Sequence, residues 1–441
     1  MRTARTAELY RCPGEEYDIP RPVHLARLAA SYSKCRHCPH APGALASSPE
    51  GANDDSPPPD NDFLRFFSLE GVRGRYLNEL SRATAPEIAG AMASCLWDET
   101  LSASATVAGT LRVPSAAPNS PNLAPASPDN QIVTAPSTTD EGIRLLRSGR
   151  PGPCVVLGHD ERPSSPDIVT GVGQMLRRMG CQVVDIGAAT RPCLMFAVDH
   201  LSAAGAVHVT GAGCDPGWIG LDFVMQGGLP CSSPGLLDRI ATCCREGYSR
   251  PTRRPGSRRA FQASVPYEAG LRKHFHALRP LKIALACPSR TLRELFARLF
   301  RRVACRLIPV ETPIRLRALL DLADPDLVRT SHRVQTECAD LGVLVDDDGE
   351  RCVFFDEAGR VVSPQLVAPL LATDTSPLEP NLNREVVTRQ MRDRDLGFSF
   401  DGAGRFWFDE GYPACDALLT LVHLLHTLSR SDRPFSDVAG R

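Results

Sequence analysis

The sequence has almost no lysine and no excess of either charge. Its 441 residues include 50 lysines and arginines against 51 aspartates and glutamates, so the formal net charge is −1. Three of the basic residues are lysines, Lys34, Lys273 and Lys282, a bias that reflects genome composition and decides little about function. A protein that binds nucleic acid or a membrane surface through charge needs a clear basic excess. We therefore expect neither nucleic acid nor a membrane among its partners.

Long apolar runs are also missing. A membrane-spanning helix needs about 18 consecutive apolar residues, and no such run occurs. The N-terminal segment carries scattered charges and no apolar stretch, so it does not have the pattern of a secretory signal. These absences predict a cytoplasmic protein. In that reducing compartment most of the 16 cysteines are expected to be buried small apolar side chains.

The composition supports two or three folded domains. With 42% hydrophobic and 23% charged residues the chain can bury ordinary cores, which excludes disorder of the full length. Residues 41–61 and 101–139 are rich in Pro, Ser, Ala and Asn and lack periodic apolar residues, so they are predicted to be linkers or disordered insertions. The segment between them predicts a helix with Thr84 as its N-cap and Pro86 in its first turn.

From Cys154 onward, short apolar runs alternate with segments of helical periodicity. The first strands and helices are predicted at 154–158, 164–180, 181–187, 192–201 and 204–213, the last of these being a strand that runs into a Gly-rich loop. This alternation is typical of a parallel α/β sheet with right-handed crossovers. Similar units begin at Leu281 and near Asp340, and a final helix is predicted from Pro413 to Leu428.

The N-terminal 40 residues hold a group of cysteines and histidines. Cys35 and Cys38 form a C-x2-C pair, which can place two thiolates on one Zn²⁺. The other two ligands are expected to be Cys12 and one of His24, His37 and His40. We predict a structural Zn²⁺ site at Cys12, His24, Cys35 and Cys38, with an iron–sulfur site or unliganded thiols as the alternatives. A segment this short rarely folds without such a cross-link.

Four segments, taken in order, resemble the α-D-phosphohexomutase superfamily of phosphoglucomutases and phosphomannomutases. FSLEGVRG at 67–74 is similar to the family's F-G-T-D-G-I-R-G, and GHDERPSSP at 158–166 to its G-x-D-x-R-x-S-S. HVTGAGCDPGWIGLDF, from His208, aligns with T-G-S-H-N-P-P-x-Y-N-G-x-K-F, and VDDDGERCVFFDEAGRVVS at 345–363 resembles the D-G-D-x-D-R metal loop. The resemblance implies repeated α/β mutase-type domains with mixed, mostly parallel sheets.

The resemblance and the linkers together divide the chain. We predict a Cys/His module at 1–40, a linker at 41–61, a first mutase-like domain at 62–228, a connection at 229–260, a second domain at 261–355 and a shortened third domain at 356–441. The family's fourth domain, whose R-x-S-G-T-x-P loop holds the substrate's non-reacting phosphate, has no expected counterpart in these residues. The family uses that binding energy to orient its reaction intermediate.

The residues that carry the family's chemistry are changed. In the family a phosphoserine donates its phosphoryl group to a sugar phosphate, and a lysine in the same motif takes part in proton transfer. The serine position is Ala212 here, and a methyl group cannot carry phosphate. The lysine position is Asp222, which has the opposite charge. We therefore predict no catalytic residue and expect the chain to be catalytically impaired or inactive.

The metal loop is better preserved. Asp346, Asp348 and Glu350 stand at its three carboxylate positions, and Arg351 stands at its arginine. Carboxylates that alternate in a tight loop can converge on Mg²⁺. The resemblance therefore implies Mg²⁺ at these three residues, with a metal-free acidic turn as the alternative.

Substrate-binding residues are implied at Arg73, Arg162, Arg351, Asp401 and Arg405. The first three are the arginines of the motifs, and together with the backbone N–H groups of 211–213 they could bind an anion. Exposed or structurally paired arginines are the alternative. Asp401 and Arg405 lie in a segment that resembles the family's sugar-binding G-E-x-S-G-H loop.

Three functions are compatible with this sequence. The preferred one is an inactive relative, in sugar-phosphate metabolism, that binds a sugar phosphate or a metal ion. A scaffold that keeps only the fold and recognises a protein partner is the second, and an active mutase with an unusual nucleophile such as Thr210 is the third. A Cys214–Asp215 nucleophile lacks a nearby base in the sequence. A dinucleotide-binding fold is disfavoured because no G-x-G-x-x-G follows the first strand of any unit.

Overall fold

The computed structural model describes residues 9–11, 18–20, 63–110, 152–317, 321–372 and 383–440, within two compact units at 1–60 and 61–441. In the first unit, β1 (Leu9–Arg11) pairs antiparallel with β2 (Asp18–Pro20). The predicted Zn²⁺ site stays a prediction, because its four residues lie outside the described part of the chain: Cys12, His24, Cys35 and Cys38.

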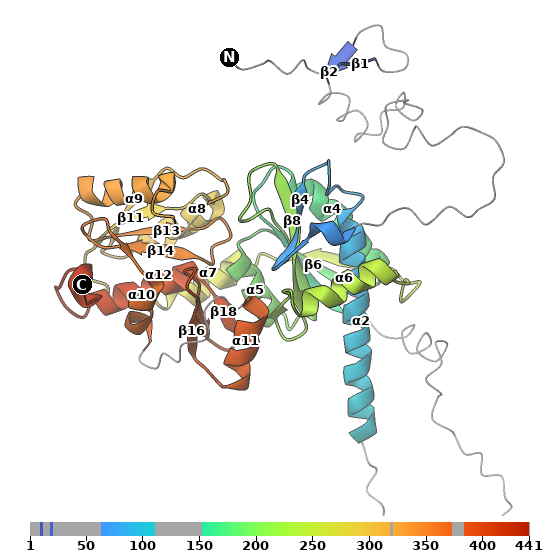
Figure 1. Cartoon of the computed structure of the whole chain (residues 1–441). Coiled ribbons are helices and arrows are strands. Elements are labelled where there is room, and N and C mark those ends of the chain that lie inside the picture. The colour runs from blue at the N-terminus through green and yellow to red at the C-terminus, as the bar shows by residue number, and fades with distance from the viewer. Residues whose placement is uncertain are drawn as a thin grey trace, which may run out of the picture. The chain divides into compact units, whose positions relative to one another are not determined.

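The second unit begins with an eight-stranded mixed sheet (Figure 1). Its strands are β3 (Phe67–Ser68), β4 (Gly71–Arg75), β5 (Cys154–His159), β6 (Gln182–Ala188), β7 (Gly205–Val209), β8 (Trp218–Met225), β9 (Leu229–Pro230) and β10 (Arg258–Ala260). Their order is β10-β6-β5-β7-β8-β4-β3, with β9 beside β8. The strands β10, β6, β5 and β7 run parallel, whereas β8 is antiparallel to both β7 and β4.

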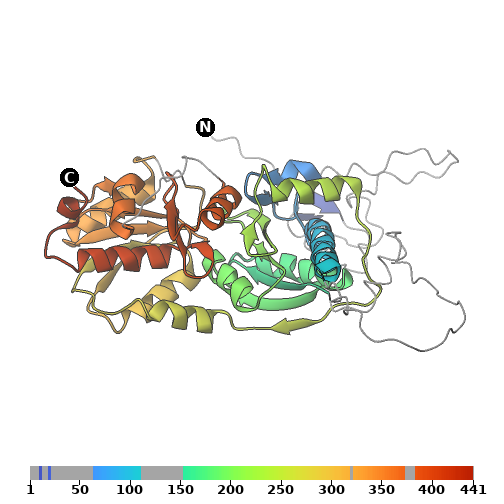
Figure 2. The same cartoon turned by 90° about the horizontal axis from the view of Figure 1, so that it is seen from below.

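Helices cover both faces of this sheet because successive side chains of a strand point to opposite faces. Val155 and Leu157 belong to the core shared with α2, α4 and α6, and Val156 belongs to the core shared with α5. Figure 2 views α2 nearly end-on beside this sheet. The helices of this part of the chain are η3 (Phe63–Phe66), α2 (Ala85–Thr110), α4 (Ser165–Arg178), α5 (Arg191–His200) and α6 (Leu236–Glu246).

A five-stranded sheet follows, in the order β12-β11-β13-β14-β15. The strands β11, β12 and β13 run parallel, and β14 and β15 are antiparallel. Ala284 and Ala286 face the core that contains α9, and Ile283 and Leu285 face the core that contains α7 and α8. The elements are α7 (Ser264–Arg272), β11 (Lys282–Ala286), α8 (Arg290–Phe300), β12 (Arg306–Val310), α9 (Pro325–Thr336), β13 (Leu341–Val345), β14 (Cys352–Phe355) and β15 (Val361–Val362).

The last part of the chain forms a three-stranded antiparallel sheet with four helices. Its apolar residues, such as Phe406 and Leu421, join the same large core as α5, α7 and α8. The elements are α10 (Pro364–Leu371), α11 (Arg384–Asp393), β16 (Phe398–Phe400), β17 (Phe406–Asp409), β18 (Pro413–Cys415), α12 (Ala417–Leu428) and α13 (Phe435–Val438).

The predicted α/β class with mixed sheets is confirmed, but most strand pairings among the described residues are antiparallel rather than parallel. Several finer expectations are corrected. The helix α2 continues past Leu101, where an insertion was expected, because residues 101–110 contain no proline to stop it. Residues 229–260, expected to be a connection, contribute β9, α6 and β10. The expected boundary at 355/356 falls between the paired strands β14 and β15.

One helix start and one predicted helix cap differ from the expectation. The last long helix begins at Ala417 rather than Pro413, because the buried Asp416 carboxylate accepts hydrogen bonds from the backbone N–H groups of Leu418 and Leu419. At the start of α2, the Thr84 hydroxyl accepts from the N–H of Ser81 instead of capping the helix. Among the described residues, none of the helices is both long enough and apolar enough to cross a bilayer.

Candidate functional site

A cleft of about 910 Å³ gathers segments that lie far apart in the sequence. Two of its loops follow the carboxyl ends of β7 and β13, which is where α/β folds place ligands. The start of α11 and the turns β3–β4 and β16–β17 complete its wall. The cleft brings together most of the residues singled out in the sequence, namely Arg73, Ala212, Asp346, Asp348, Arg351, Asp401 and Arg405.

The loop after β7 contains no group that could carry a phosphoryl group in the family's manner. Ala212 occupies the serine position and is buried. Thr210, the alternative nucleophile, is completely buried, and its hydroxyl donates to Asp160 Oδ2 at 3.1 Å and accepts from the N–H of Ala212 at 2.9 Å. Cys214 lines the cleft, but burial raises the pKa of its thiol, so it is protonated rather than nucleophilic.

The backbone N–H groups of this loop are already used, contrary to the expected anion site. The N–H of Gly211 donates to Asp160 Oδ2 at 2.9 Å, and that of Ala212 donates to Thr210. The N–H of Gly213 donates to Asp347 Oδ1 at 3.3 Å. The Asp347 carboxylate comes from the loop between β13 and β14, so an internal anion takes the position where these donors could hold a phosphate.

Arg162 holds this internal carboxylate in place. Its Nη2 donates to Asp347 Oδ2 at 2.9 Å, and its Nε donates to Asp160 Oδ2 at 3.1 Å. Its remaining donors reach the carbonyl oxygens of Cys214 and Asp215 at 3.0 and 2.8 Å. With its side chain 2% exposed, Arg162 fastens two loops together and does not face the cleft.

The Asp222 carboxylate, at the family's lysine position, is surrounded by three arginines. The Nη1 atoms of Arg73, Arg191 and Arg384 lie 2.6, 3.0 and 3.9 Å from its oxygens. Burial raises the pKa of Asp222, but the three guanidinium groups lower it overall, so the group is an anion. Arg191 also contacts Glu350 Oε1 at 2.9 Å, which links β8 to the metal loop.

Arg384, the first residue of α11, lies against the metal loop. Its Nη2 is 3.2 Å from Asp348 Oδ2 and 2.5 Å from Glu350 Oε2. The second contact is an ion pair without hydrogen-bond alignment. Burial raises the pKa of Asp348, but the Arg384 charge and neighbouring groups lower it to about 2. A guanidinium therefore lies against two of the three carboxylates that were predicted to bind Mg²⁺, and burial raises the pKa of one of them, Glu350, despite its arginine neighbours.

The third carboxylate, Asp346, is turned toward the protein. Its Oδ1 accepts from the backbone N–H groups of Gly349, Glu350 and Arg351 at 3.0–3.1 Å. Burial and the nearby Asp348 raise its pKa well above the usual range, which favours the protonated form. Mg²⁺ takes oxygen ligands in near-octahedral geometry. With Arg384 against Asp348 and Glu350 and with Asp346 Oδ1 bound to backbone N–H groups, the loop as folded does not fit that ion.

The turn between β3 and β4 supplies a further anion, Glu70. Its carboxylate accepts from Arg405 Nη1 at 2.9 Å, and its Oε2 lies 2.5 Å from Arg405 Nη2 and 3.3 Å from Arg384 Nη1. Burial raises the pKa of Glu70, but the two arginines lower it strongly overall. Arg405 is buried. Its Nη1 also lies 3.7 Å from Asp401 Oδ2.

Arg351 differs from the other arginines of the cleft. In the described ranges, the five others each have a carboxylate within ion-pair distance, namely Arg73, Arg315, Arg317, Arg384 and Arg405. Arg351 has none in that part of the chain and is partly exposed. It is therefore the cleft cation most available to an external anion.

Sequence reasoning missed Glu70, Arg191 and Arg384. Glu70 could have been found, because it stands at the aspartate of the family's first motif. Arg191 and Arg384 belong to none of the motifs. In the structure each is the first residue of a helix and contacts the carboxylates of the site. Their role depends on packing between segments that are far apart in the chain.

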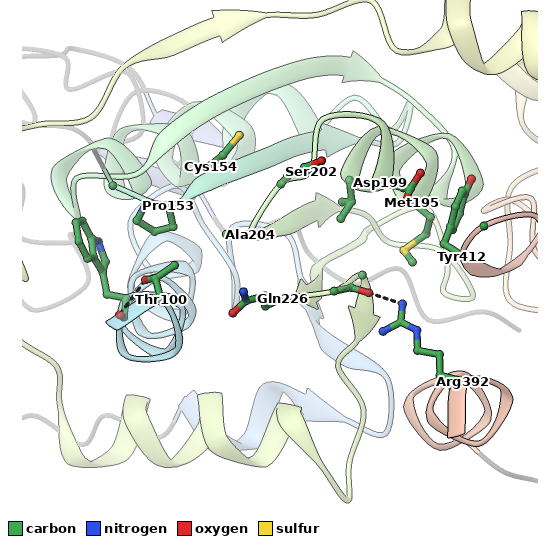
Figure 3. Close-up of a pocket in the computed structure, with 17 residues that line it drawn as sticks. Thr100, Pro153, Cys154, Met195, Asp199, Ser202, Ala204, Gln226, Arg392 and Tyr412 are labelled. Carbon is green, nitrogen blue, oxygen red and sulfur yellow. Dashed lines mark hydrogen bonds between the residues drawn. The ribbon is translucent and has the colours of Figure 1, made fainter. Parts of the chain in front are cut away.

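A second hollow, of about 980 Å³, lies apart from these residues (Figure 3). Trp97 and Thr100 of α2 line one part of it, and Arg392 of α11 and Tyr412 line another. Arg392 donates to the carbonyl oxygen of Gly227, as Figure 3 shows. None of the substrate or Mg²⁺ residues predicted from the sequence lines this hollow, so we do not assign the mutase-like site to it.

Comparison with known proteins agrees with the resemblance. Residues 137–249 match the family model "Phosphoglucomutase/phosphomannomutase, alpha/beta/alpha domain I". The phosphomannomutase/phosphoglucomutase of Pseudomonas aeruginosa is 26% identical over 245 residues, which cover 54% of this chain and 51% of that protein. The phosphoglucosamine mutase of Symbiobacterium thermophilum is 24% identical, over 65% of this chain and 72% of that protein. The matches place the mutase-like domain at residues 137–249 in the α-D-phosphohexomutase superfamily.

The fold of the superfamily is also recovered in solved structures. A phosphoglucomutase/phosphomannomutase family protein of Burkholderia thailandensis superposes with a TM-score of 0.65 at 18% identity, covering 85% of this chain and 79% of that one. Members of the superfamily are generally Mg²⁺-dependent. The chain spans about half the length of the first curated relatives it matches.

Proposed function

We propose that this chain is a catalytically inactive phosphohexomutase-family protein that binds a phosphorylated sugar in the 910 Å³ cleft without a metal ion. The proposal rests on two side chains of the protein that occupy positions where an external anion and a metal ion would be expected. The Asp347 carboxylate fills the anion position of the 211–213 loop, and the Arg384 guanidinium lies against Asp348 and Glu350. With Ala212 at the nucleophile position, phosphoryl transfer has neither an acceptor oxygen nor a metal to balance charge.

Ligand binding is supported by the walls of the cleft. Arg351 is partly exposed and unpaired among the described residues, and a guanidinium fork matches the geometry of a phosphate group. Asp401 lines the same cleft; its Oδ1 accepts from the backbone N–H groups of Ala403 and Arg405, so Oδ2 is the oxygen that can accept a hydrogen bond from a sugar hydroxyl group. The proposed ligand is a hexose monophosphate, whose phosphate contacts Arg351 and whose ring lies toward Asp401.

Catalysis is tested with glucose 1-phosphate or mannose 1-phosphate, each with its 1,6-bisphosphate and Mg²⁺. We expect no sugar 6-phosphate to accumulate, as measured by ³¹P NMR, and turnover would overturn the inactive assignment.

Binding is tested by calorimetry with glucose 6-phosphate in EDTA. We expect Arg351→Ala to weaken it at least about tenfold, because a charge-assisted phosphate contact is worth about 1.5–3 kcal/mol. Arg254→Ala, at an exposed arginine outside the cleft, is the matched control.

If no hexose phosphate binds, the remaining hypothesis is a scaffold that recognises a protein partner. In that case neither Arg351→Ala nor added sugar phosphate would change the melting temperature. The two results separate a ligand-binding protein from a fold retained for other contacts.

A further inference from the structure

Two histidines and a glutamate from three separate segments lie close together, and none of the three lines the 910 Å³ cleft. His274 follows α7, Glu410 lies in the turn between β17 and β18, and His423 belongs to α12. One ligand atom of each lies within 4.8 Å of the others. His274 Nε2 is 3.1 Å from Glu410 Oε1. The rings of His274 and His423 are 5.5 Å apart in an edge-on arrangement.

The neighbours of these side chains hold them in place. Lys273 Nζ lies 3.0 Å from Glu410 Oε2, and His274 Nε2 lies 3.1 and 3.3 Å from Oε1 and Oε2, so both side chains hold this carboxylate. The His423 ring stacks on Phe408 at 4.8 Å. His426 Nε2 donates to the carbonyl oxygen of His274 at 2.7 Å, which ties the loop after α7 to α12. Partners that orient the ligands are a usual part of a metal site.

We propose that His274, Glu410 and His423 form a site for a transition-metal dication, with Zn²⁺ as the best match. Two imidazole nitrogens and one carboxylate oxygen are a donor set that Zn²⁺ accepts at about 2.0–2.2 Å, with a fourth position open to water. Mg²⁺ and Ca²⁺ favour oxygen ligands, so this site does not select them. Binding requires the three side chains to close in from their present spacing.

The site would fasten one wall of the second hollow. Gly411 and Tyr412 follow Glu410 directly and line that 980 Å³ space (Figure 3). A metal at Glu410 ties their turn to α12 and to the end of α7. The site therefore acts as a cross-link of the β17–β18 turn, independent of the proposed sugar-phosphate cleft.

The experiment uses the full chain with Cys12→Ser, Cys35→Ser and Cys38→Ser, which removes the N-terminal thiols as competing ligands. Calorimetry with Zn²⁺ is repeated on Glu410→Gln, at an exposed residue, and on His274→Asn, at a partly exposed one. The matched controls are Glu337→Gln, at a partly exposed residue, and His276→Gln, at an exposed one, both outside the three-residue site. Co²⁺ in place of Zn²⁺ reports the coordination by its visible absorption.

We expect one Zn²⁺ per chain, with affinity at least about tenfold lower in Glu410→Gln and His274→Asn and unchanged in the two controls, since even indirect partners of a metal are worth 10–100-fold. Zn²⁺ should also raise the melting temperature of the parent and not of Glu410→Gln. Absence of binding at micromolar Zn²⁺, or equal affinity in the ligand variants, would overturn the proposal. Sugar-phosphate binding by calorimetry in EDTA is measured separately, so either proposal can fail alone.

Discussion

Arg384 lies against two carboxylates of the loop between β13 and β14, at 3.2 Å from Asp348 and 2.5 Å from Glu350. A single side chain thereby supplies positive charge to a loop that the superfamily uses for a metal ion. The cost of burying charges is met only if each has a partner, so the guanidinium and the carboxylates depend on one another. The same logic applies to Asp347 of this loop, which pairs with Arg162 of the loop after β5.

Replacing Arg384 with methionine tests this dependence. Asp348 and Glu350 then lose their shared counter-charge in a buried site, which should cost about 3–5 kcal/mol of the free energy of unfolding. We expect Mg²⁺ to restore part of this loss in Arg384→Met and to leave the wild type unchanged. Urea unfolding with and without Mg²⁺ measures both. An equal response of the two proteins to Mg²⁺ would contradict the neutralising role of Arg384.

Restoring the family serine should not restore the chemistry. In Ala212→Ser the hydroxyl returns, but the metal loop still holds Arg384 and the lysine position is still Asp222. We expect no phosphoryl adduct after incubation with glucose 1,6-bisphosphate and Mg²⁺, measured by intact-mass spectrometry against the wild type. A stoichiometric adduct on Ser at position 212 would show that the substitution of the nucleophile alone had silenced the site.

At the scale of an element, α12 begins at a buried acid. The Asp416 carboxylate accepts from the N–H groups of Leu418 and Leu419 and from the Tyr267 hydroxyl at 2.7 Å. Burial nevertheless raises the pKa of Asp416 from 3.8 to about 6. The helix start is thus fixed by a group that is easier to bury when protonated.

This raised pKa predicts a pH dependence with a definite sign. The folded protein holds the proton more tightly than the unfolded chain, so the contribution to stability is fully present below pH 3.8 and is lost as the pH rises through about 6. The shift corresponds to about 3 kcal/mol. Asp416→Asn keeps the cap without the charge, so it should raise the free energy of unfolding at pH 7.5 and match wild type near pH 4.

Chemical denaturation across this pH range provides the measurement. Asp416→Ala is the companion variant, because it loses the cap and should be destabilised by about 1 kcal/mol or more at both pH values. A stability difference between Asp416→Asn and wild type that does not vary with pH would contradict the raised pKa.

At the scale of the whole second unit, ion pairs connect the eight-stranded sheet to elements that follow it in the chain. Asp222 of β8 faces Arg73, Arg191 and Arg384. Arg162, which precedes α4, faces Asp347 of the metal loop. These pairs are buried, so salt screens them far less than pairs at the surface. They fix the cleft walls as one network of matched charges.

Replacing Asp222 with lysine, the residue of the family's motif, should therefore destabilise the folded protein. Asp222→Lys places a fourth cation among three arginines in a buried site, and we expect a loss of at least about 3–5 kcal/mol in the free energy of unfolding. Asp185→Asn, which breaks the more exposed pair with Arg258, should cost about 0–1 kcal/mol. Urea denaturation of both variants compares them. Comparable stabilities would mean that the Asp222 network carries little of the fold.

Most of the α/β framework could be predicted from sequence because strand and helix periodicities are local. The runs at Cys154, Gln182 and Gly205 became strands β5, β6 and β7. The start of α12 was misplaced, since the side chain that decides it, Asp416, caps the helix only when buried against Tyr267. Of the site, the loop at Ala212 and the metal loop were found through motifs, whereas Arg384 lies in a segment with no motif.

The sequence alone determined that the nucleophile position is Ala212 and the lysine position Asp222, because covalent chemistry depends on which atoms are present. Tertiary structure decided what takes their place. Only in the folded chain do Asp347 and Gly213, 134 residues apart, form a hydrogen bond, and only there does Arg384 reach Asp348. Charges in a buried site are matched by whichever partners the packing brings within a few ångströms, and no local pattern in the sequence encodes that proximity.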